Sequence, residues 1–157
     1  MPRAQAQRAR VVLAFDFGLR RIGIACGDTI SRRAAPHRAA PVAPRGLDWS
    51  PIDRALRLFK PHVLVVGSPR HADGSAAGHS AAADRFAAAL AQRSGLPVER
   101  ADEFASSIEA AAQLKSQRAS GQRRRRVQRA DIDSAAAAII LERWLRQTEA
   151  GVGGERA

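Results

Sequence analysis

The sequence predicts an α/β fold, in which helices flank a sheet of mixed strand direction. Two short, continuous apolar runs, 11–15 and 63–66, are typical of strands that are covered on both faces. An opening hairpin is followed by segments that repeat their apolar residues at helical spacing. A hairpin followed by alternating helices and strands indicates a sheet that is neither purely parallel nor purely antiparallel.

The first predicted elements form the hairpin. The buried strand 11–15 ends at Asp16, and Gly18 permits a tight turn after it. A second strand begins at Ile22 and alternates through Cys26, so it can fold back beside the first.

The middle of the chain alternates between extended and helical patterns. Segment 31–45 contains three prolines and has no period, which predicts an extended stretch or one edge strand. Ser50 is expected to cap a helix that has Pro51 at its first position and ends at Pro61. The apolar run 63–66 follows as a buried strand.

A further helix and strand are predicted after the glycine-containing loop 67–78. The inner face of this helix is expected to consist of Ala83, Phe86, Ala87 and Leu90. A short strand then begins at Val98 and ends at Asp102 and Glu103.

The last third of the chain is predicted to hold two helices joined by a basic loop. Residues 106–109 form a capping box that starts a helix reaching Leu114. Segment 115–129 is basic and polar and is expected to be a loop. The last helix is expected from about 131 to 145 and is rich in alanine.

A chain of 157 residues is long enough for one domain and too short for two. We expect this domain at 11–147. The basic segment 1–10 and the glycine-containing segment 148–157 are expected to be disordered tails.

The charge of the chain points to a polyanionic partner. Its formal net charge is +11, and the electric field of such a charge attracts nucleic acid.

Cys26 is the single cysteine, which excludes an intrachain disulfide and a multi-cysteine metal site and favours a cytoplasmic location. The apolar run after the basic N-terminus is too short for a signal peptide or a membrane span, so no membrane partner is expected.

Three carboxylates are predicted to meet at one edge of the sheet. Asp16 and Glu103 each stand where a buried strand ends, so they share an edge if their strands are parallel neighbours. On the last helix, Asp133 shares a face with Ile140, whereas Asp131 is offset by about 200° and is the better N-cap. Simpler interpretations exist: Asp16 can initiate a turn, and Asp133 can be an acidic residue stabilised by the helix dipole.

A cluster of three carboxylates favours a metal site. At about 4 Å and an effective dielectric of about 20, each ionised pair repels by about 4 kcal/mol, which a divalent cation would offset. Oxygen ligands without a Cys or His cluster favour Mg²⁺ or Mn²⁺ over zinc. Two such ions would activate a water and stabilise the leaving oxygen of a phosphodiester. An acidic centre in a basic protein is the arrangement expected of a nuclease.

Two groups of arginines are candidates for holding the nucleic-acid backbone. One adjoins the opening turn and the other is the four-residue run in the basic loop. The candidates are Arg20, Arg21, Arg123, Arg124, Arg125 and Arg126. Such a run is also typical of a solvated loop.

Four segments together resemble the YqgF family, also called RuvX. These are AFDFGLRRIGIACGD, VVGSPRHADGS, the DE of ADEFASSIEAAAQL, and DIDSAAAAIILERWL. They occur in the family's order and cover about 11–147. The family consists of bacterial proteins with a ribonuclease-H-like fold, related to the RuvC Holliday junction resolvase.

The resemblance implies that Asp16, Glu103 and Asp133 are a catalytic, metal-binding acidic triad. It also implies a cytoplasmic enzyme that matures the 5′ end of 16S ribosomal RNA precursor, with Holliday junction cleavage as the alternative. This chain has Phe104 where the family usually has arginine, and Ser68 where an apolar residue is usual. If that arginine meets a phosphate in the family, its role passes to Arg20, Arg21 or the run 123–126, and otherwise weak activity is expected.

Two other function classes compete with the nuclease. An ATPase of the actin and sugar-kinase type also opens with D-x-G after a strand. That class needs a second phosphate loop and a duplicated domain, and this sequence has neither the second motif nor the length for them. A catalytically idle nucleic-acid-binding protein would keep the fold without metal-dependent cleavage. Resolvases act as two-fold dimers so that paired cuts are symmetric, so a monomer would favour the RNA substrate. We expect a monomer or a weak homodimer.

Overall fold

The computed structural model describes residues 9–69, 79–103 and 129–154. The elements are β1 (Val11–Asp16), β2 (Arg21–Asp28), β3 (Ala34–Ala43), β4 (Gly46–Leu47), α1 (Ser50–Phe59), β5 (Val63–Pro69), α2 (His79–Ser94), β6 (Val98–Glu103) and α4 (Arg129–Gly154). The predicted capping box, its helix and most of the basic loop lie outside the described residues.

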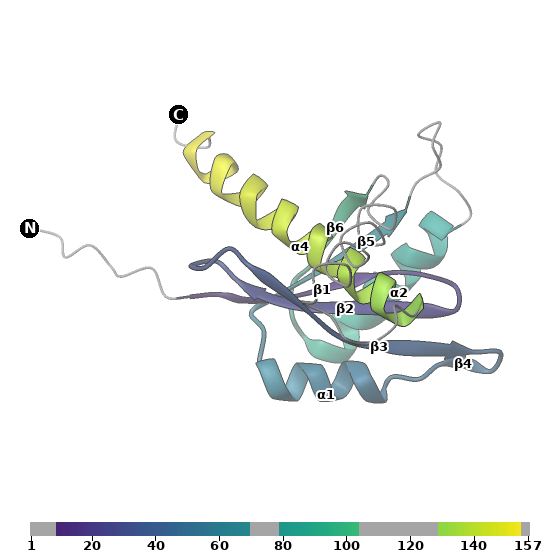
Figure 1. Cartoon of the computed structure of the whole chain (residues 1–157). Coiled ribbons are helices and arrows are strands. Elements are labelled where there is room, and N and C mark those ends of the chain that lie inside the picture. The colour runs from purple at the N-terminus through teal and green to yellow at the C-terminus, as the bar shows by residue number, and fades with distance from the viewer. Residues whose placement is uncertain (1–8, 70–78, 104–128, 155–157) are drawn as a thin grey trace, which may run out of the picture.

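The described strands form one mixed sheet of six strands in the order β4-β3-β2-β1-β5-β6. The pairs β1/β2, β2/β3 and β3/β4 are antiparallel, whereas the pairs β1/β5 and β5/β6 are parallel. Helices lie on both sides of the sheet, with α1 below and α4 above in Figure 1. The predicted α/β fold with a mixed sheet is therefore confirmed.

Segment 31–45 contains a longer strand than its prolines suggested. Strand β3 extends over ten residues and pairs with β2 along most of its length. On its other side, the short β4 pairs only with Val42 and Ala43. Among the described strands, Pro36 and Pro41 therefore lie in one whose second side is largely unpaired, where a missing N–H is tolerated.

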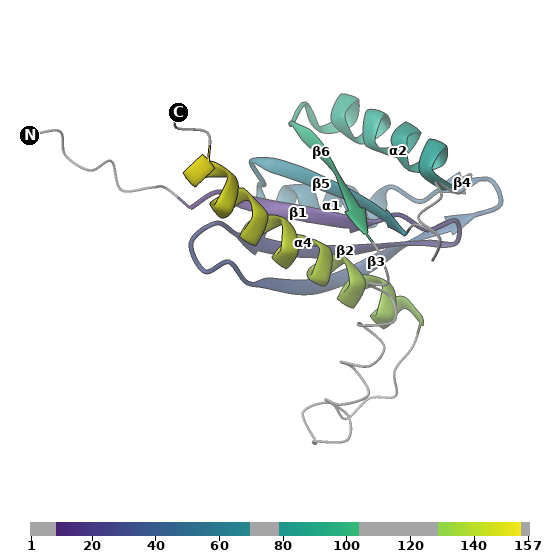
Figure 2. The same ribbon diagram turned by 90° about the horizontal axis from the view of Figure 1, so that it is seen from above.

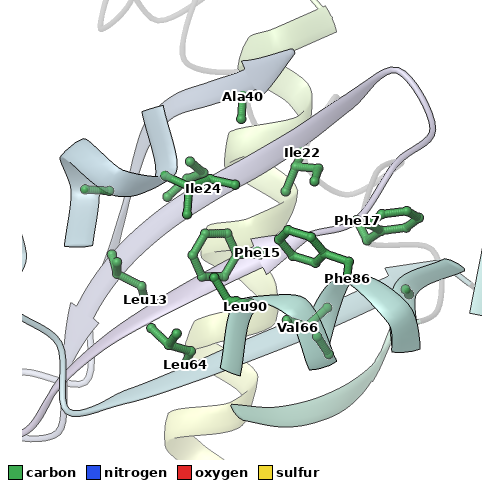
Figure 3. Packing of buried hydrophobic residues seen from close by; sticks show 14 residues of the cluster. Leu13, Phe15, Phe17, Ile22, Ile24, Ala40, Leu64, Val66, Phe86 and Leu90 are labelled. Atoms are coloured by element: carbon green, nitrogen blue, oxygen red, sulfur yellow. The ribbon is translucent and has the colours of Figure 1, made fainter. Parts of the chain in front are cut away.

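Alternating residues of β1 supply two separate cores. Leu13 and Phe15 pack toward α1 and α2 with Phe86 and Leu90, as Figure 3 shows. Val12 and Ala14 face the other way and pack with residues of α4. The buried members of this second cluster are Val12, Ala14, Val63, Val65, Ile140, Leu141 and Leu145. Side chains that alternate along a strand thus explain the continuous apolar run that the sequence shows.

Helix α2 has the predicted inner face. The buried residues of this face are Ala83, Phe86, Ala87 and Leu90. The Phe86 ring lies 5.8 Å from Phe15, 5.6 Å from Phe17 and 5.7 Å from Trp49, centroid to centroid. Gly95 follows the helix with a φ of +70°, a conformation that glycine adopts without strain.

The cap predicted for α1 was wrong by one residue. Trp49 occupies the N-cap position and makes no side-chain capping bond. Asp48 instead accepts a hydrogen bond at Oδ1 from the backbone N–H of Ser50, at 3.0 Å. Asp48, two residues before Ser50, thus supplies the carboxylate acceptor at the start of the helix, where the Ser50 side chain was expected to act as the cap.

Helix α4 is longer than predicted at both ends. It begins at Arg129, so Asp131 lies in its first turn rather than at its N-cap. It continues through Gly154, into the segment that was expected to be a disordered tail. Figure 2 shows α4 crossing the sheet obliquely over β1, β2 and β3. No helix in the described parts of the chain is long and apolar enough to span a membrane.

Strand β6 is fastened to both helical layers. On one side, Trp144 of α4 donates a hydrogen bond from Nε1 to Oε2 of Glu99, at 2.7 Å. On the other, Arg100 donates from Nε to Asp84 of α2 at 2.8 Å, and from Nη1 to the carbonyl of Val66 at 3.0 Å. Two successive residues of one strand therefore contact opposite layers.

An ion pair between α1 and α2 predicts acid sensitivity. Arg93 donates two hydrogen bonds to Asp53, both at 2.7 Å, and they hold the pKa of Asp53 below its ordinary value. The pair therefore stabilises the fold above the unfolded pKa of the aspartate, and this contribution is lost as the pH falls through the lower folded pKa. Asp53→Asn should lower the melting temperature by a few degrees at neutral pH and flatten its fall in acid.

Melting curves recorded from pH 7 down to pH 3 would test this prediction. Arg93→Gln should reproduce the effect, because it removes the other half of the pair. An acid profile of Asp53→Asn identical to that of the parent would contradict it.

Candidate active site

Asp16 is a buried carboxylate at the end of the central strand. It closes β1 and is 6% exposed. Val12 and Ala14, which have the same parity in the strand, pack with the α4 cluster, so Asp16 lies on the α4 side of the sheet. A charged carboxylate that is this buried needs polar or cationic partners. Such burial is unusual for an aspartate that only starts a turn.

Gly23 lets α4 reach the sheet beside Asp16. In the antiparallel pairing of β1 and β2, Asp16 stands opposite Gly23. A Cβ at Gly23 would lie 1.9 Å from the carbonyl oxygen of Asp133, a distance that no side chain can occupy. The second turn region of α4 therefore contacts the sheet at the position paired with Asp16. This role was not predicted, although a glycine between two isoleucines inside a strand is a signal of close backbone approach.

Asp133 lies on the sheet side of α4 and is held by an arginine. Arg21 of β2 donates a hydrogen bond from Nε to Oδ2 of Asp133, at 2.7 Å. The two side chains are 30% and 25% exposed. Ile140, which was expected on the same helix face, is fully buried. The ion pair itself was not predicted, because Arg21 had been considered only as a phosphate ligand.

Glu103 stands at the same end of the sheet, but not on a strand next to β1. Asp16 and Glu103 were expected to share an edge if their strands were parallel neighbours, whereas β5 lies between β1 and β6. The register aligns Asp16 with Gly67 and Gly67 with Ala101, so Glu103 lies two residues farther along its strand. The side chain of Glu103 is outside the described part of the structure.

The candidate phosphate-binding arginines are only partly described. Arg20 is exposed, and its carbonyl accepts a hydrogen bond from the N–H of Val42 at 2.8 Å. Arg21 forms the ion pair with Asp133. The run 123–126 lies outside the described residues, as does Phe104.

The donor set at this end of the sheet fits a divalent cation. Within the described residues, no group of three or more His, Cys, Asp or Glu side chains could hold a metal. However, the buried Asp16 and the Asp133 carboxylate offer oxygen ligands, which Mg²⁺ and Mn²⁺ prefer. The Arg21 guanidinium already neutralises part of the charge of Asp133, so a cation bound there would share this carboxylate with Arg21.

The chain matches known proteins over most of its length. The family model described as "RuvX: Holliday junction resolvase" matches residues 10–147. A protein of Xanthomonas axonopodis pv. citri (strain 306), named "Putative pre-16S rRNA nuclease", is 42% identical over 146 residues, which are 92% of this chain and 94% of the relative. A protein of the same name from Xanthomonas campestris pv. campestris (strain B100) is 41% identical over 150 residues, 95% and 96% of the two chains.

Two solved structures share the fold at low sequence identity. RuvC of T. thermophilus, solved in complex with a Holliday junction substrate, has a TM-score of 0.50 and 17% identity, covering 89% of this chain and 96% of RuvC. The yeast mitochondrial Holliday junction resolvase Ydc2 has a TM-score of 0.51 and 17% identity, covering 92% of this chain and 81% of Ydc2. The mixed sheet with helices on both faces is thus the ribonuclease-H-like α/β fold that the sequence motifs implied.

The family model and the relatives agree with the four sequence segments. The match includes β1 with Asp16, β6 with Glu103 and the part of α4 that carries Asp133. Relatives with more than two fifths of their residues identical align along nearly their whole length. The chain therefore belongs to the RuvX (YqgF) family of nucleases.

Proposed function

We propose that this protein is a metal-dependent phosphodiester hydrolase that processes the 5′ end of the 16S ribosomal RNA precursor in the cytoplasm. The observation that carries the proposal is the position of Asp16, a buried carboxylate on the α4 side of the sheet, opposite the glycine that Asp133 contacts. The names of the relatives supply the substrate class, because they are named for pre-16S rRNA.

Asp16, Glu103 and Asp133 are the proposed ligands of Mg²⁺ or Mn²⁺. Two divalent ions bound there would supply an activated water and stabilise the leaving oxygen of a phosphodiester. In this role the carboxylate of Asp16 is fixed by the buried strand that ends with it. Asp133 is fixed by α4, which Gly23 allows to lie close to the sheet. Rigid elements of this kind hold ligands more exactly than loops do.

The nucleic-acid backbone is proposed to lie along arginines near this site. The net charge of +11 attracts the RNA without reading its sequence. Arg20 and Arg21 follow the carboxylate end of β1, and the run 123–126 precedes α4 in the chain. These residues are the proposed phosphate contacts of a monomer or weak homodimer.

A second candidate function is the resolution of Holliday junctions. It is favoured by the description of the family model and by the two resolvases that share the fold. A resolvase makes symmetric paired cuts and therefore acts as a two-fold dimer.

Purified protein should be assayed on a pre-16S RNA fragment and on a four-way DNA junction, and its molecular mass in solution should be measured. Cleavage of the RNA by a monomer supports the proposal, whereas paired cuts in the junction by a dimer support the alternative. Binding without cleavage of either substrate would indicate an idle binding protein.

Asp133→Asn should reduce cleavage sharply, by about 100-fold or more, because it removes a charged ligand oxygen. Asp131→Asn, two residues earlier in the first turn of α4, is the matched control and should reduce cleavage little. Rates of RNA cleavage at saturating Mg²⁺ would check the ranking. The reverse ranking would mean that Asp131, not Asp133, serves the site.

A further inference from the structure

Arg21, the first residue of β2, is bonded to a proposed metal ligand. Its Nε donates to Oδ2 of Asp133 at 2.7 Å, and this pair joins β2 to the first turns of α4. The side chains are 30% and 25% exposed. An ion pair at this depth is accessible to solvent and ions, so other cations can compete for the carboxylate.

The pair supplies positive charge where the fold gathers negative charge. Asp16 is 6% exposed and stands opposite Gly23, which contacts the backbone of Asp133. Two carboxylates carried by adjacent parts of the fold repel each other, and a guanidinium against one of them offsets part of that repulsion. Arg21 therefore performs electrostatically, with one charge, part of what a divalent cation would do with two.

A guanidinium and a divalent cation on the same carboxylate oxygen repel each other. Binding of the cation must then weaken the ion pair, and the ion pair must weaken binding of the cation by the same factor. We propose that Arg21 is a positioning residue, which holds Asp133 in the metal-free protein and gives up Oδ2 when a divalent cation binds. This proposal rests on the metal-dependent function proposed above.

A purely structural role for Arg21 makes the opposite prediction. If the ion pair only held Asp133 in place, its loss would loosen a ligand and weaken metal binding. If Arg21 competes with the metal, its loss should tighten metal binding while the metal-free protein becomes less stable. The direction of the change in metal affinity therefore separates the two roles.

The test is titration calorimetry with Mg²⁺ and Mn²⁺ on the full chain, without nucleic acid. Arg21→Gln is compared with Arg20→Gln, which removes the same charge from an exposed position one residue earlier. Arg21→Gln should bind either cation about fivefold or more tightly than Arg20→Gln. Arg21→Lys, which keeps the charge, should fall between Arg21→Gln and the parent. In an Asp133→Asn background, the gain from Arg21→Gln should disappear.

Equal or weaker binding by Arg21→Gln overturns the proposal. If Arg21→Gln is too unstable for calorimetry, the increase in melting temperature on adding Mg²⁺ replaces it, and this increase should be larger for Arg21→Lys than for Arg20→Gln. If the parent protein binds neither cation and cuts no RNA, the proposed metal-dependent function itself is wrong. If the parent binds Mg²⁺ and cuts RNA, but Arg21→Gln shows no gain in cation affinity, only the proposed role of Arg21 is wrong.

Discussion

Replacing Asp16 with asparagine should slow cleavage of a pre-16S RNA fragment by about 100-fold or more, which corresponds to about 2.7 kcal/mol of transition-state stabilisation. The change keeps the size of the side chain but removes a charged oxygen from a carboxylate that is 6% exposed. The fold should persist, because the core residues of β1 are unchanged. Binding of RNA should persist as well, because the basic surface is unchanged.

Three measurements test the Asp16→Asn prediction together: the cleavage rate, the affinity for RNA, and the melting temperature with and without Mg²⁺. Mg²⁺ should stabilise the variant less than the parent. Asp28→Asn is the matched control, because Asp28 pairs with Val11 at the opposite end of the same two strands. It removes the same charge and should leave cleavage unchanged. If Asp16→Asn cuts as fast as the parent, Asp16 is a turn residue and the proposed mechanism is wrong.

Gly23→Ala should impair both stability and cleavage. The added Cβ would lie 1.9 Å from the carbonyl oxygen of Asp133, so α4 must move away from the sheet or β2 must shift. Overpacking of this kind costs about 1 to 3 kcal/mol, and the movement displaces the backbone that carries Asp133. We expect a clearly lower melting temperature and a loss of cleavage of about 100-fold, similar to that of Asp133→Asn.

Gly46→Ala is the control for Gly23→Ala. Its added Cβ would meet nothing within 4 Å, although its φ of +128° makes alanine unfavourable there. It should therefore lower stability modestly and leave cleavage unchanged. A Gly23→Ala protein with the melting temperature and cleavage rate of the parent would show that α4 does not need this close approach.

The elements that sequence reasoning found are those with strong local patterns. Buried runs identified β1 and β5, alternation identified β2, and helical spacing identified the inner face of α2. The extent of β3 was not predicted, because its prolines argue against a strand and only its position near the sheet edge makes them tolerable. The ends of α4 were also missed, because tertiary packing of one helix face outweighs a weak terminal sequence signal.

The candidate site was predictable in its carboxylates but not in their surroundings. The ends of buried strands and one helix face led to Asp16, Glu103 and Asp133 without a structure. The insertion of β5 between β1 and β6 could not be derived, because strand order depends on contacts between distant segments. For the same reason, the pairing of Arg21 with Asp133, 112 positions apart, has no signature in a single sequence.

The hydrogen bonds that join β6 to α4 and to α2 affect how this edge strand can open. A strand at the edge of a sheet has ladder bonds on one side only and is usually the first to separate from it. Here Glu99 is bonded to α4 and Arg100 to α2, so separation of β6 from the sheet must also break a bond to one helix on each face. Local opening of this strand is thereby coupled to a larger cooperative unit. Because β6 ends at Glu103, bonds to both helical layers lie only three and four positions before that residue in the same strand.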